Sequence, residues 1–209
     1  MTNLIFVRHG QSESNLKHIF CGQTDVALTQ KGHRQAKKTA EYIIKNYKID
    51  KIYSSDLQRA YNTGKYIAEL CGIKIITDEG LREINAGDWE CKSYDYIEEN
   101  HSDDYWAWRH NIGIVKCSGG ESVEEMANRF YKTVVKIAEE NDGKTVAITT
   151  HSCPLRAMHC LFEGLTLEHM QEKPWVNNAA VGVVEYSDKA FKIKLWNEDE
   201  HLAEINAED

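Results

Sequence analysis

The chain has 209 residues, 42% of them apolar, so it can bury a sizeable core, and one large domain is the simplest organisation. Its formal net charge of −8 at pH 7 excludes a general nucleic-acid binder, although a local group of arginines can still hold a small anionic substrate. No apolar run has the length of a membrane span, and the first ten residues lack a signal-peptide pattern, so we expect a cytoplasmic protein with no membrane partner.

Strand-like and helical patterns alternate along the chain. Apolar, often β-branched runs predict strands at residues 4–9, 51–55, 73–78, 145–151, 179–187 and 191–197. The first four show little alternation, as strands buried on both faces do, whereas the last alternates apolar and charged residues like a half-exposed edge strand. Apolar residues at helical spacing predict helices over residues 29–47, 56–71, 122–137 and 154–161.

Helix start signals support this order. Thr29 is a candidate N-cap, Ser122 and Glu125 form the pattern of a capping box, and Pro154 suits a first helical turn. The alternation predicts an α/β fold, a three-layer sandwich in which helices cover both faces of a mostly parallel sheet of about six strands. Ligands of such folds bind beyond the carboxyl ends of the strands.

Polar side chains come directly after the first four predicted strands. Arg8 and His9 end the first, Arg59 follows the second, Glu83 follows the third, and His151 ends the fourth. Arginines can neutralise phosphoryl oxygens, a neutral imidazole can attack phosphorus, and a carboxylic acid can protonate the leaving oxygen. The set therefore predicts a phosphoryl-transfer site. Four neighbouring carboxylates are alternatives to Glu83 as the acid: Asp78, Glu79, Asp88 and Glu90.

Six segments spread over nearly the whole chain share the pattern of one family. In chain order they are VRHGQSESN (7–15), FCGQTDVALTQKGHRQA (20–36), SSDLQRAYNT (54–63), LREINAGDWE (81–90), GGES (119–122) and THSCPLR (150–156). Together they resemble the histidine phosphatase superfamily, in its phosphoglycerate-mutase-like branch, which implies a single domain of that fold over residues 1–209. The chain departs from the family where Cys153-Pro154 and Cys91 stand at positions that are commonly glycine, so we expect a bulkier pocket edge.

The resemblance implies a role for each candidate residue. His9 would be the nucleophile that becomes phosphohistidine, and Glu83 the general acid and then the base that activates water. Arg8, Arg59 and His151 would form the phosphate pocket. The implied substrate-binding residues are Gly10, Ser14, Asn15, Gln23, Thr24 and Ser152. The family implies no metal and no cofactor, and the alternative of a metal site built from His9, Glu83 and His151 lacks a recognised ligand spacing.

The longest stretch between core strands, residues 84–120, is predicted to form a cap-like insertion over the active site. The aromatic residues of the segment 98–110, together with Trp89, Tyr94 and Tyr96, are candidates for the roof of the pocket. The charges of the segment 98–110 are expected to form a solvated surface.

The six cysteines are scattered without CxxC spacing, which favours reduced thiols. Four lie in or beside the pocket segments, namely Cys21, Cys91, Cys117 and Cys153. Either these cysteines simply fill space, or Cys153, near two arginines and a helix N-terminus, has a lowered pKa and reacts readily.

The predicted function is hydrolysis of a small phosphorylated metabolite by a phosphomonoesterase that forms phosphohistidine at His9. One alternative is a phosphoglycerate mutase that uses the same chemistry, although the residues after Glu83 resemble the phosphatase branch. A second alternative is a non-catalytic phospho-ligand sensor, against which the complete set of catalytic residues argues. Sugar phosphates, nucleotide-precursor phosphates and phosphoglycerates all stay open as substrates, and the oligomeric state is not predicted.

Overall fold

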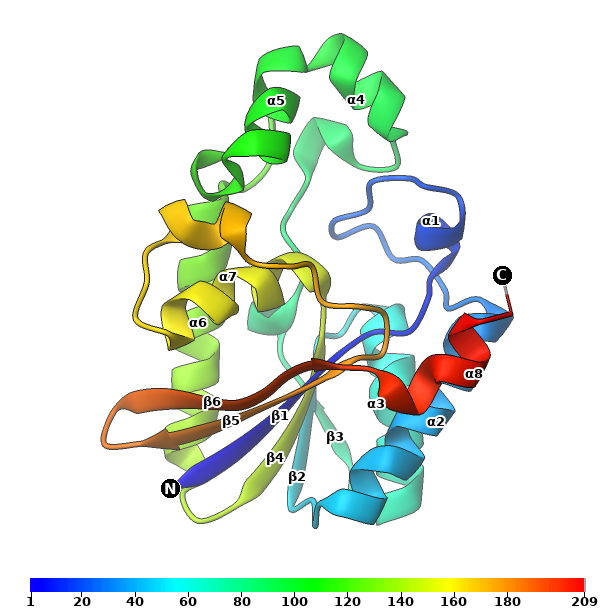
Figure 1. Ribbon diagram of the computed structural model, residues 1–209, viewed down its shortest axis with the longest axis vertical. Helices are drawn as coiled ribbons and strands as arrows, with labels where there is room; N and C mark the ends of the chain where they lie inside the picture. The colour runs from blue at the N-terminus through cyan, green and yellow to red at the C-terminus, as the bar shows by residue number, and fades with distance from the viewer. Residues whose placement is uncertain (209) are drawn as a thin grey trace.

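The computed structural model describes residues 1–208, within which six strands form one sheet in the order β3–β2–β4–β1–β5–β6 (Figure 1). The strands are β1 (Thr2–Arg8), β2 (Lys51–Ser54), β3 (Ile75–Thr77), β4 (Thr145–Thr150), β5 (Val181–Ser187) and β6 (Ala190–Glu198). The first four strands run parallel, whereas β5 is antiparallel to β1 and β6 is antiparallel to β5. The predicted α/β fold with a mostly parallel sheet is confirmed.

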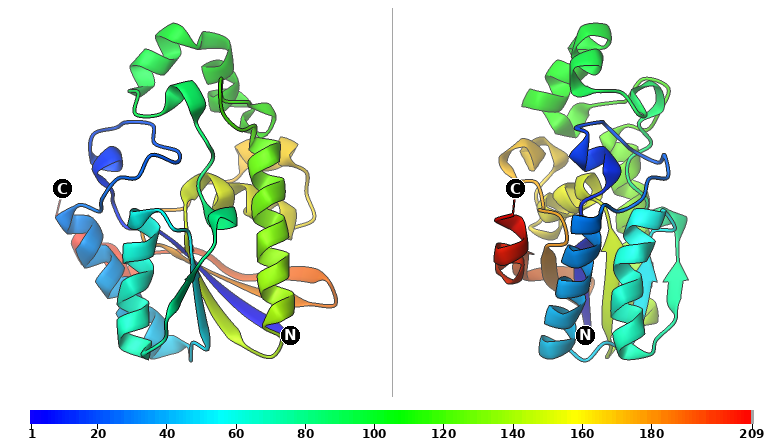
Figure 2. Two further views of the ribbon diagram at one scale, coloured as in Figure 1. Left: turned by 180° about the vertical axis from the view of Figure 1, so that it is seen from behind. Right: turned by 90° about the vertical axis from the view of Figure 1, so that its right-hand side faces the viewer.

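Helices cover both faces of this sheet, with α2 and α3 on one face and α6 and α7 on the other (Figures 1 and 2). The helices are α1 (Glu13–Leu16), α2 (Gln30–Asn46), α3 (Gln58–Cys71), α4 (Tyr94–Asn100), α5 (Ser102–His110), α6 (Val123–Glu140), α7 (Ser152–Phe162) and α8 (Ala203–Asn206). Across the described residues, none of them is both long enough and apolar enough to cross a membrane.

The residues predicted to cap the N-termini of two helices do so in the structure. The Thr29 hydroxyl caps α2, and Ser122 and Glu125 complete a capping box at α6. Helix α7 begins two residues earlier than predicted, at Ser152, so Pro154 still lies in its first turn.

Alternation along the central strand explains why both faces are covered. Leu4 and Phe6 of β1 belong to the hydrophobic cluster that contains α6 and α7, whereas Ile5 and Val7 belong to the cluster that contains α2 and α3. Strand β1 is therefore buried on both sides and holds its carboxyl end rigidly.

Strand β3 differs from the expectation of burial on both faces. It is a short outer strand with β2 as its one neighbour in the sheet, and Ile76 and Thr77 are exposed. An outer strand is less covered by the layers around it, which a run of apolar residues does not reveal. Strand β6, at the opposite edge, alternates exposed and half-buried residues as predicted.

The segment over residues 84–120 leaves the sheet and carries α4 and α5 beyond the carboxyl ends of the strands (Figures 1 and 2). Phe20 packs edge to face against Trp89 and Trp108, with ring centroids 5.4 and 5.0 Å apart. This aromatic contact fixes the segment to the loop that follows β1.

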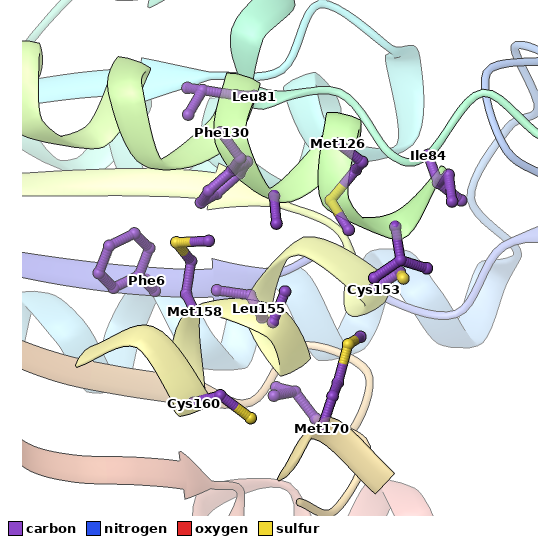
Figure 3. Packing of buried hydrophobic residues seen from close by; sticks show 14 of the residues in the cluster. Phe6, Leu81, Ile84, Met126, Phe130, Cys153, Leu155, Met158, Cys160 and Met170 are labelled. Atoms are coloured by element: carbon purple, nitrogen blue, oxygen red, sulfur yellow. The ribbon is translucent and has the colours of Figure 1, made fainter. Parts of the chain in front are cut away.

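Below the carboxyl edge, the side chains of α6 and α7 interlock in the larger hydrophobic cluster (Figure 3). Met126 and Phe130 come from α6, and Leu155 and Met158 from α7. Cys153, which is 2% exposed, is part of this cluster. Tight packing here holds the start of α7 against the sheet.

Candidate active site

The carboxyl edge of the sheet opens into a cavity of about 700 Å³. Its inner part is lined by Arg8, His9, Asn15, Arg59, Glu83 and Ser152. Because the first four strands are parallel, their ends meet here. The fifth predicted catalytic residue, His151, is fully buried beside His9, with ring centroids 5.3 Å apart.

His9 keeps the lone pair of one ring nitrogen available. Its Nδ1 lies 2.7 Å from the carbonyl oxygen of Gly10, which can only accept, so Nδ1 carries the proton and Nε2 carries none. Burial first, and then the charges of Arg59 and Arg8, hold the pKa of His9 well below 6.5. At neutral pH His9 is a neutral imidazole, which is the form that a nucleophile requires.

Close backbone packing fixes the loop around His9. A Cβ atom on Gly10 would lie 2.3 Å from the carbonyl oxygen of Gly32 in α2, so a larger residue would push the two segments apart. On the other side, Asn178 Nδ2 donates to the carbonyl of His9 at 3.1 Å. No local pattern in the sequence marks Asn178, because folding alone brings the loop before β5 to this position.

His151 presents an unpaired donor. Its Nε2 lies 2.8 Å from Ser55 Oγ, which also accepts the N–H of Leu57 and so has its own proton free to donate to Nε2. Nδ1 then carries the ring proton, and among residues 1–208 it has no hydrogen-bond partner although it is buried. Burial and the charge of Arg59 hold the pKa of His151 well below 6.5, so it is a neutral donor.

Two arginines place positive charge at the cavity without forming a salt bridge to any described residue. Arg8 Nη1 donates to the carbonyl of Val176 at 2.5 Å, and burial lowers the pKa of Arg8 to about 10. Arg59, 1% exposed, donates to the carbonyls of Gly22 and Thr24 at 2.6 and 3.0 Å. Arg59 is buried and Arg8 partly buried, and cations held in the protein without a carboxylate partner make a site for an anion.

Glu83 is placed to hold a proton. It is 8% exposed, and its two carboxyl oxygens accept the backbone N–H groups of Ile84 and Cys153 at 2.9 and 3.2 Å. Burial raises the pKa of Glu83 above 4.5, although both hydrogen bonds and the charges of Arg59 and Arg8 oppose this shift. A carboxyl group with a raised pKa beside a cavity is suited to general acid catalysis.

The backbone of Glu83 is held from α6 by Arg129. The Arg129 guanidinium donates to the carbonyls of Gly80, Arg82 and Glu83 at 3.0, 3.1 and 3.1 Å. Both carboxylate oxygens of Glu121 accept hydrogen bonds from the same guanidinium, each at 2.9 Å. Arg129 and Glu121 thus form a clamp on the loop that carries the acid.

Glu90 organises the loop that holds Arg59. Its carboxylate accepts the backbone N–H groups of Gly22, Gln23 and Thr24 at 3.1, 2.6 and 3.2 Å. This turns the carbonyls of Gly22 and Thr24 toward Arg59, to which they bond. Glu90 therefore acts on the position of Arg59 rather than as the acid at the cavity, which it does not line.

The six predicted substrate-binding residues divide into two groups. The cavity is lined by Ser14, Asn15 and Ser152 but not by Gly10, Gln23 and Thr24. The Gly10 N–H donates to Thr63 Oγ1, and Gln23 Nε2 donates to the carbonyl of Glu83, each at 3.1 Å. In this structure these two groups bond within the protein, and the substrate-binding role expected of Gly10, Gln23 and Thr24 stays a prediction.

The segment above the sheet reaches the cavity through some of the aromatic residues that were candidates for its roof. Tyr94, Tyr105 and Trp108 line it, whereas Trp89 is fully buried and Tyr96 lies outside it. The charged residues Glu98 and Arg109 are exposed, as expected for the segment 98–110, and they also line the cavity. Trp175 also lines the cavity, from the loop before β5, and no local pattern in the sequence marks it.

Of the two alternatives for Cys153, the lowered pKa is wrong. Burial, followed by the charge of Glu83, holds the pKa of this thiol well above 9.0. Loss of water around the thiolate outweighs the helix N-terminus, so Cys153 fills space. In the part of the chain that the structure describes, no three His, Cys, Asp or Glu side chains are grouped to hold a metal ion.

Residues 4–199 match the family model of the histidine phosphatase superfamily (branch 1). The chain belongs to this superfamily. It is 31% identical over 211 residues to phosphoserine phosphatase 1 of Hydrogenobacter thermophilus, covering 100% of this chain and 98% of the relative. It is 36% identical over 174 residues to a 2,3-bisphosphoglycerate-dependent phosphoglycerate mutase of Cytophaga hutchinsonii, covering 80% of each.

The solved structure of Bacillus stearothermophilus YhfR superimposes with a TM-score of 0.92 at 27% identity, covering 97% of this chain and 100% of that one. Family and fold therefore agree with the sequence prediction. This member of the histidine phosphatase superfamily is an enzyme of the phosphohydrolase class.

Proposed function

We propose that this histidine phosphatase superfamily member is a phosphomonoesterase that transfers the phosphoryl group of a small ester to His9 and then to water. The observation that carries the proposal is the neutral His9 ring, whose proton is fixed on Nδ1 by the Gly10 carbonyl, beside two arginines that have no carboxylate partner. This combination supplies a nucleophile and a binding site for an anion in the same place.

In the first step, His9 Nε2 attacks phosphorus, and the bond between phosphorus and the alcohol oxygen breaks. Glu83 donates its proton to that oxygen, so the alcohol leaves neutral and Glu83 becomes a carboxylate. Arg8, Arg59 and the Nδ1–H of His151 bind the phosphoryl oxygens, where negative charge must be held throughout the transfer.

In the second step, the Glu83 carboxylate takes a proton from a water molecule while the water oxygen attacks the phosphorus on His9. The bond between phosphorus and Nε2 breaks, and inorganic phosphate leaves. Glu83 is again protonated and His9 is again neutral, so the enzyme returns to its starting form.

The relatives include a phosphatase and a mutase, which differ in the molecule that accepts the phosphoryl group from the enzyme. A mutase would return the phosphoryl group to a bound glycerate, whereas a phosphatase gives it to water. The match to the phosphoserine phosphatase spans the full chain, whereas the match to the mutase covers 80% of it, which favours the phosphatase. Phosphoserine is therefore the first small ester to assay.

The test is to mix the purified protein briefly with labelled phosphoserine in the presence of a chelator, quench in alkali and recover protein-bound phosphate. We expect an acid-labile phosphoenzyme, and we expect His9→Ala to abolish it and lower kcat by about 10⁴-fold or more. His169→Ala, which removes an exposed histidine, is the matched control and leaves both unchanged.

Three outcomes would contradict the proposal. Substantial turnover by His9→Ala would show that another group attacks phosphorus. Conversion of one phosphoglycerate isomer to another, without release of phosphate, would identify a mutase. A rate that is lost on chelation and restored by zinc or magnesium would show metal-assisted hydrolysis.

A further inference from the structure

One side of the cavity is built from aromatic side chains. They are Phe20, Tyr94, Tyr105, Trp108 and Trp175, contributed by the loop after β1, by α4 and α5, and by the loop before β5. We call these five residues the aromatic wall. Three of them are nearly buried, but Tyr94 and Trp175 each keep 39% of their surface exposed. Large apolar surface left uncovered inside a concave site marks a place for a ligand.

The two partly exposed side chains, Tyr94 and Trp175, are held in place by contacts with their neighbours. The Arg156 guanidinium lies 4.3 Å from the ring centroid of Trp175, and Trp108 stacks on the same indole at 5.9 Å. Arg156 is itself fixed by donating to the carbonyls of Lys173 and Gln171 at 2.8 and 3.1 Å. Contacts with Arg156 and Trp108 thus fix the position of the Trp175 indole.

Tyr94 is fixed in a similar way at the start of α4. Its ring packs edge to face on Phe20, with centroids 5.9 Å apart. Phe20 packs in turn on Trp108 at 5.0 Å. The wall is therefore a connected and preformed surface, so a ligand need not spend binding free energy to order it.

We propose that the aromatic wall binds a planar, apolar group on the alcohol part of the substrate, so that this enzyme prefers phosphomonoesters whose leaving alcohol carries a ring. The inference rests on the proposed function, because the phosphoryl group is taken to occupy the inner end of the cavity at His9. A cavity of about 700 Å³ is in the size range that encloses drug-sized ligands, and a phosphorylated alcohol as small as serine would leave the wall uncovered.

The charges at the same cavity set a limit on this ring-bearing group. Asp95, Glu98 and Arg109 line the cavity too, and all three are exposed. Exposed charges keep their water, so they add little attraction for a substrate, whereas covering Tyr94 and Trp175 releases water from apolar surface. The ring is thus expected to lie on the wall and not among the charges.

The test compares two esters whose alcohols leave equally well, propyl phosphate and 3-phenylpropyl phosphate. We expect kcat/KM to be at least about tenfold higher for 3-phenylpropyl phosphate, with the difference mainly in KM, because the wall contacts the ring equally before and during phosphoryl transfer.

Trp175→Ala is expected to reduce this preference, measured as the ratio of kcat/KM for the two esters in the same protein, about fivefold or more. Trp175→Phe keeps an aromatic face and is expected to retain most of the preference. Trp106→Ala is the matched control, because Trp106 is 62% exposed on the neighbouring cap helix and does not line the cavity. It is expected to leave both esters unaffected.

Equal kcat/KM for the two esters in the wild-type protein would overturn the inference, and so would an unchanged preference in Trp175→Ala. The wild-type comparison needs no variant, so it decides the question even if a variant fails to fold. Failure of the proposed function gives a different result, namely no phosphate release from either ester and no phosphoenzyme at His9.

Discussion

Burial displaces the pKa values of His9 and Glu83 in opposite directions. Removing water disfavours the charged form of any group, so it lowers the pKa of the imidazole and raises that of the carboxyl. The result is a pair in which His9 is a free base and Glu83 retains its proton at mildly acidic pH. The first step of the proposed mechanism needs both neutral forms at once.

The first prediction follows from these directions. On an alkyl ester, kcat/KM is expected to fall as pH rises through the raised pKa of Glu83, and also to fall as pH drops through the lowered pKa of His9. Glu83→Gln is expected to remove the alkaline limb and to lower kcat/KM by about 10²–10⁴-fold on the alkyl ester, with a smaller loss on an aryl ester whose oxygen leaves readily.

The measurement is the ratio of wild-type to Glu83→Gln rates across pH, for one alkyl and one aryl phosphate. The ester's own second ionisation, near pH 6 as for other phosphate monoesters, affects both proteins alike and cancels in the ratio. An equal loss on the two esters at every pH would show that Glu83 only shapes the pocket.

At the scale of elements, the site depends on loops that are fixed by residues outside the cavity. Arg129, nearly two turns into α6, holds the backbone on either side of the acid through three carbonyls. Glu90 does the equivalent for the loop that holds Arg59. Rigid helices thus set the geometry of irregular segments that could not fix themselves.

We predict that Arg129→Met lowers kcat on alkyl esters by about 10- to 100-fold, because displacement of Glu83 by a fraction of an ångström weakens proton transfer to the leaving oxygen. The loss on an aryl ester is expected to be smaller, and Arg129→Lys is expected to recover part of the activity. Arg34→Met is the matched control, because it breaks an ion pair with Glu208 on the exposed face of α2. A uniform loss on all esters would indicate general damage to the fold.

The sequence predicted the parts of the site that lie next to a strand end. Arg8 and His9 follow directly from β1, so an apolar run and two polar residues were enough to place them. Trp175 reaches the cavity, and Asn178 reaches the loop at His9, through the packing of distant segments, and no local pattern in the sequence indicates such packing. The alternative of a lowered pKa for Cys153 was wrong because burial, which decides this pKa, depends on how α6 and α7 pack together.

At the scale of the whole molecule, binding an anion conflicts with stability. Arg8 brings a positive charge into the protein with one hydrogen bond to Val176, and its Nε lacks a partner among residues 1–208. Burial lowers its pKa from 12.5 to about 10, because the surrounding protein solvates the charge less well than water does. Arg59 differs, because its guanidinium links α3 to the carbonyls of Gly22 and Thr24 in the loop before α2.

The two arginines are therefore expected to affect stability in opposite directions although both are needed for activity. In phosphate-free buffer, Arg8→Met is expected to raise the melting temperature by about 2–4 °C, equivalent to about 1 kcal/mol, because it removes a poorly solvated charge. Arg59→Met is expected to lower the unfolding free energy by about 1–3 kcal/mol, because the carbonyls of Gly22 and Thr24 lose the hydrogen bonds that Arg59 donates.

Phosphate at 100 times its Kd for the wild type is expected to stabilise the wild type by about 2.7 kcal/mol, and to stabilise neither variant, because each lacks one of the arginines that bind the anion. Thermal unfolding of the three proteins with and without phosphate measures all of these effects. An Arg8→Met protein less stable than the wild type would contradict this prediction. It would mean that the hydrogen bond of Arg8 to Val176 and its attraction to Glu83 stabilise the folded state by more than the burial of its charge costs.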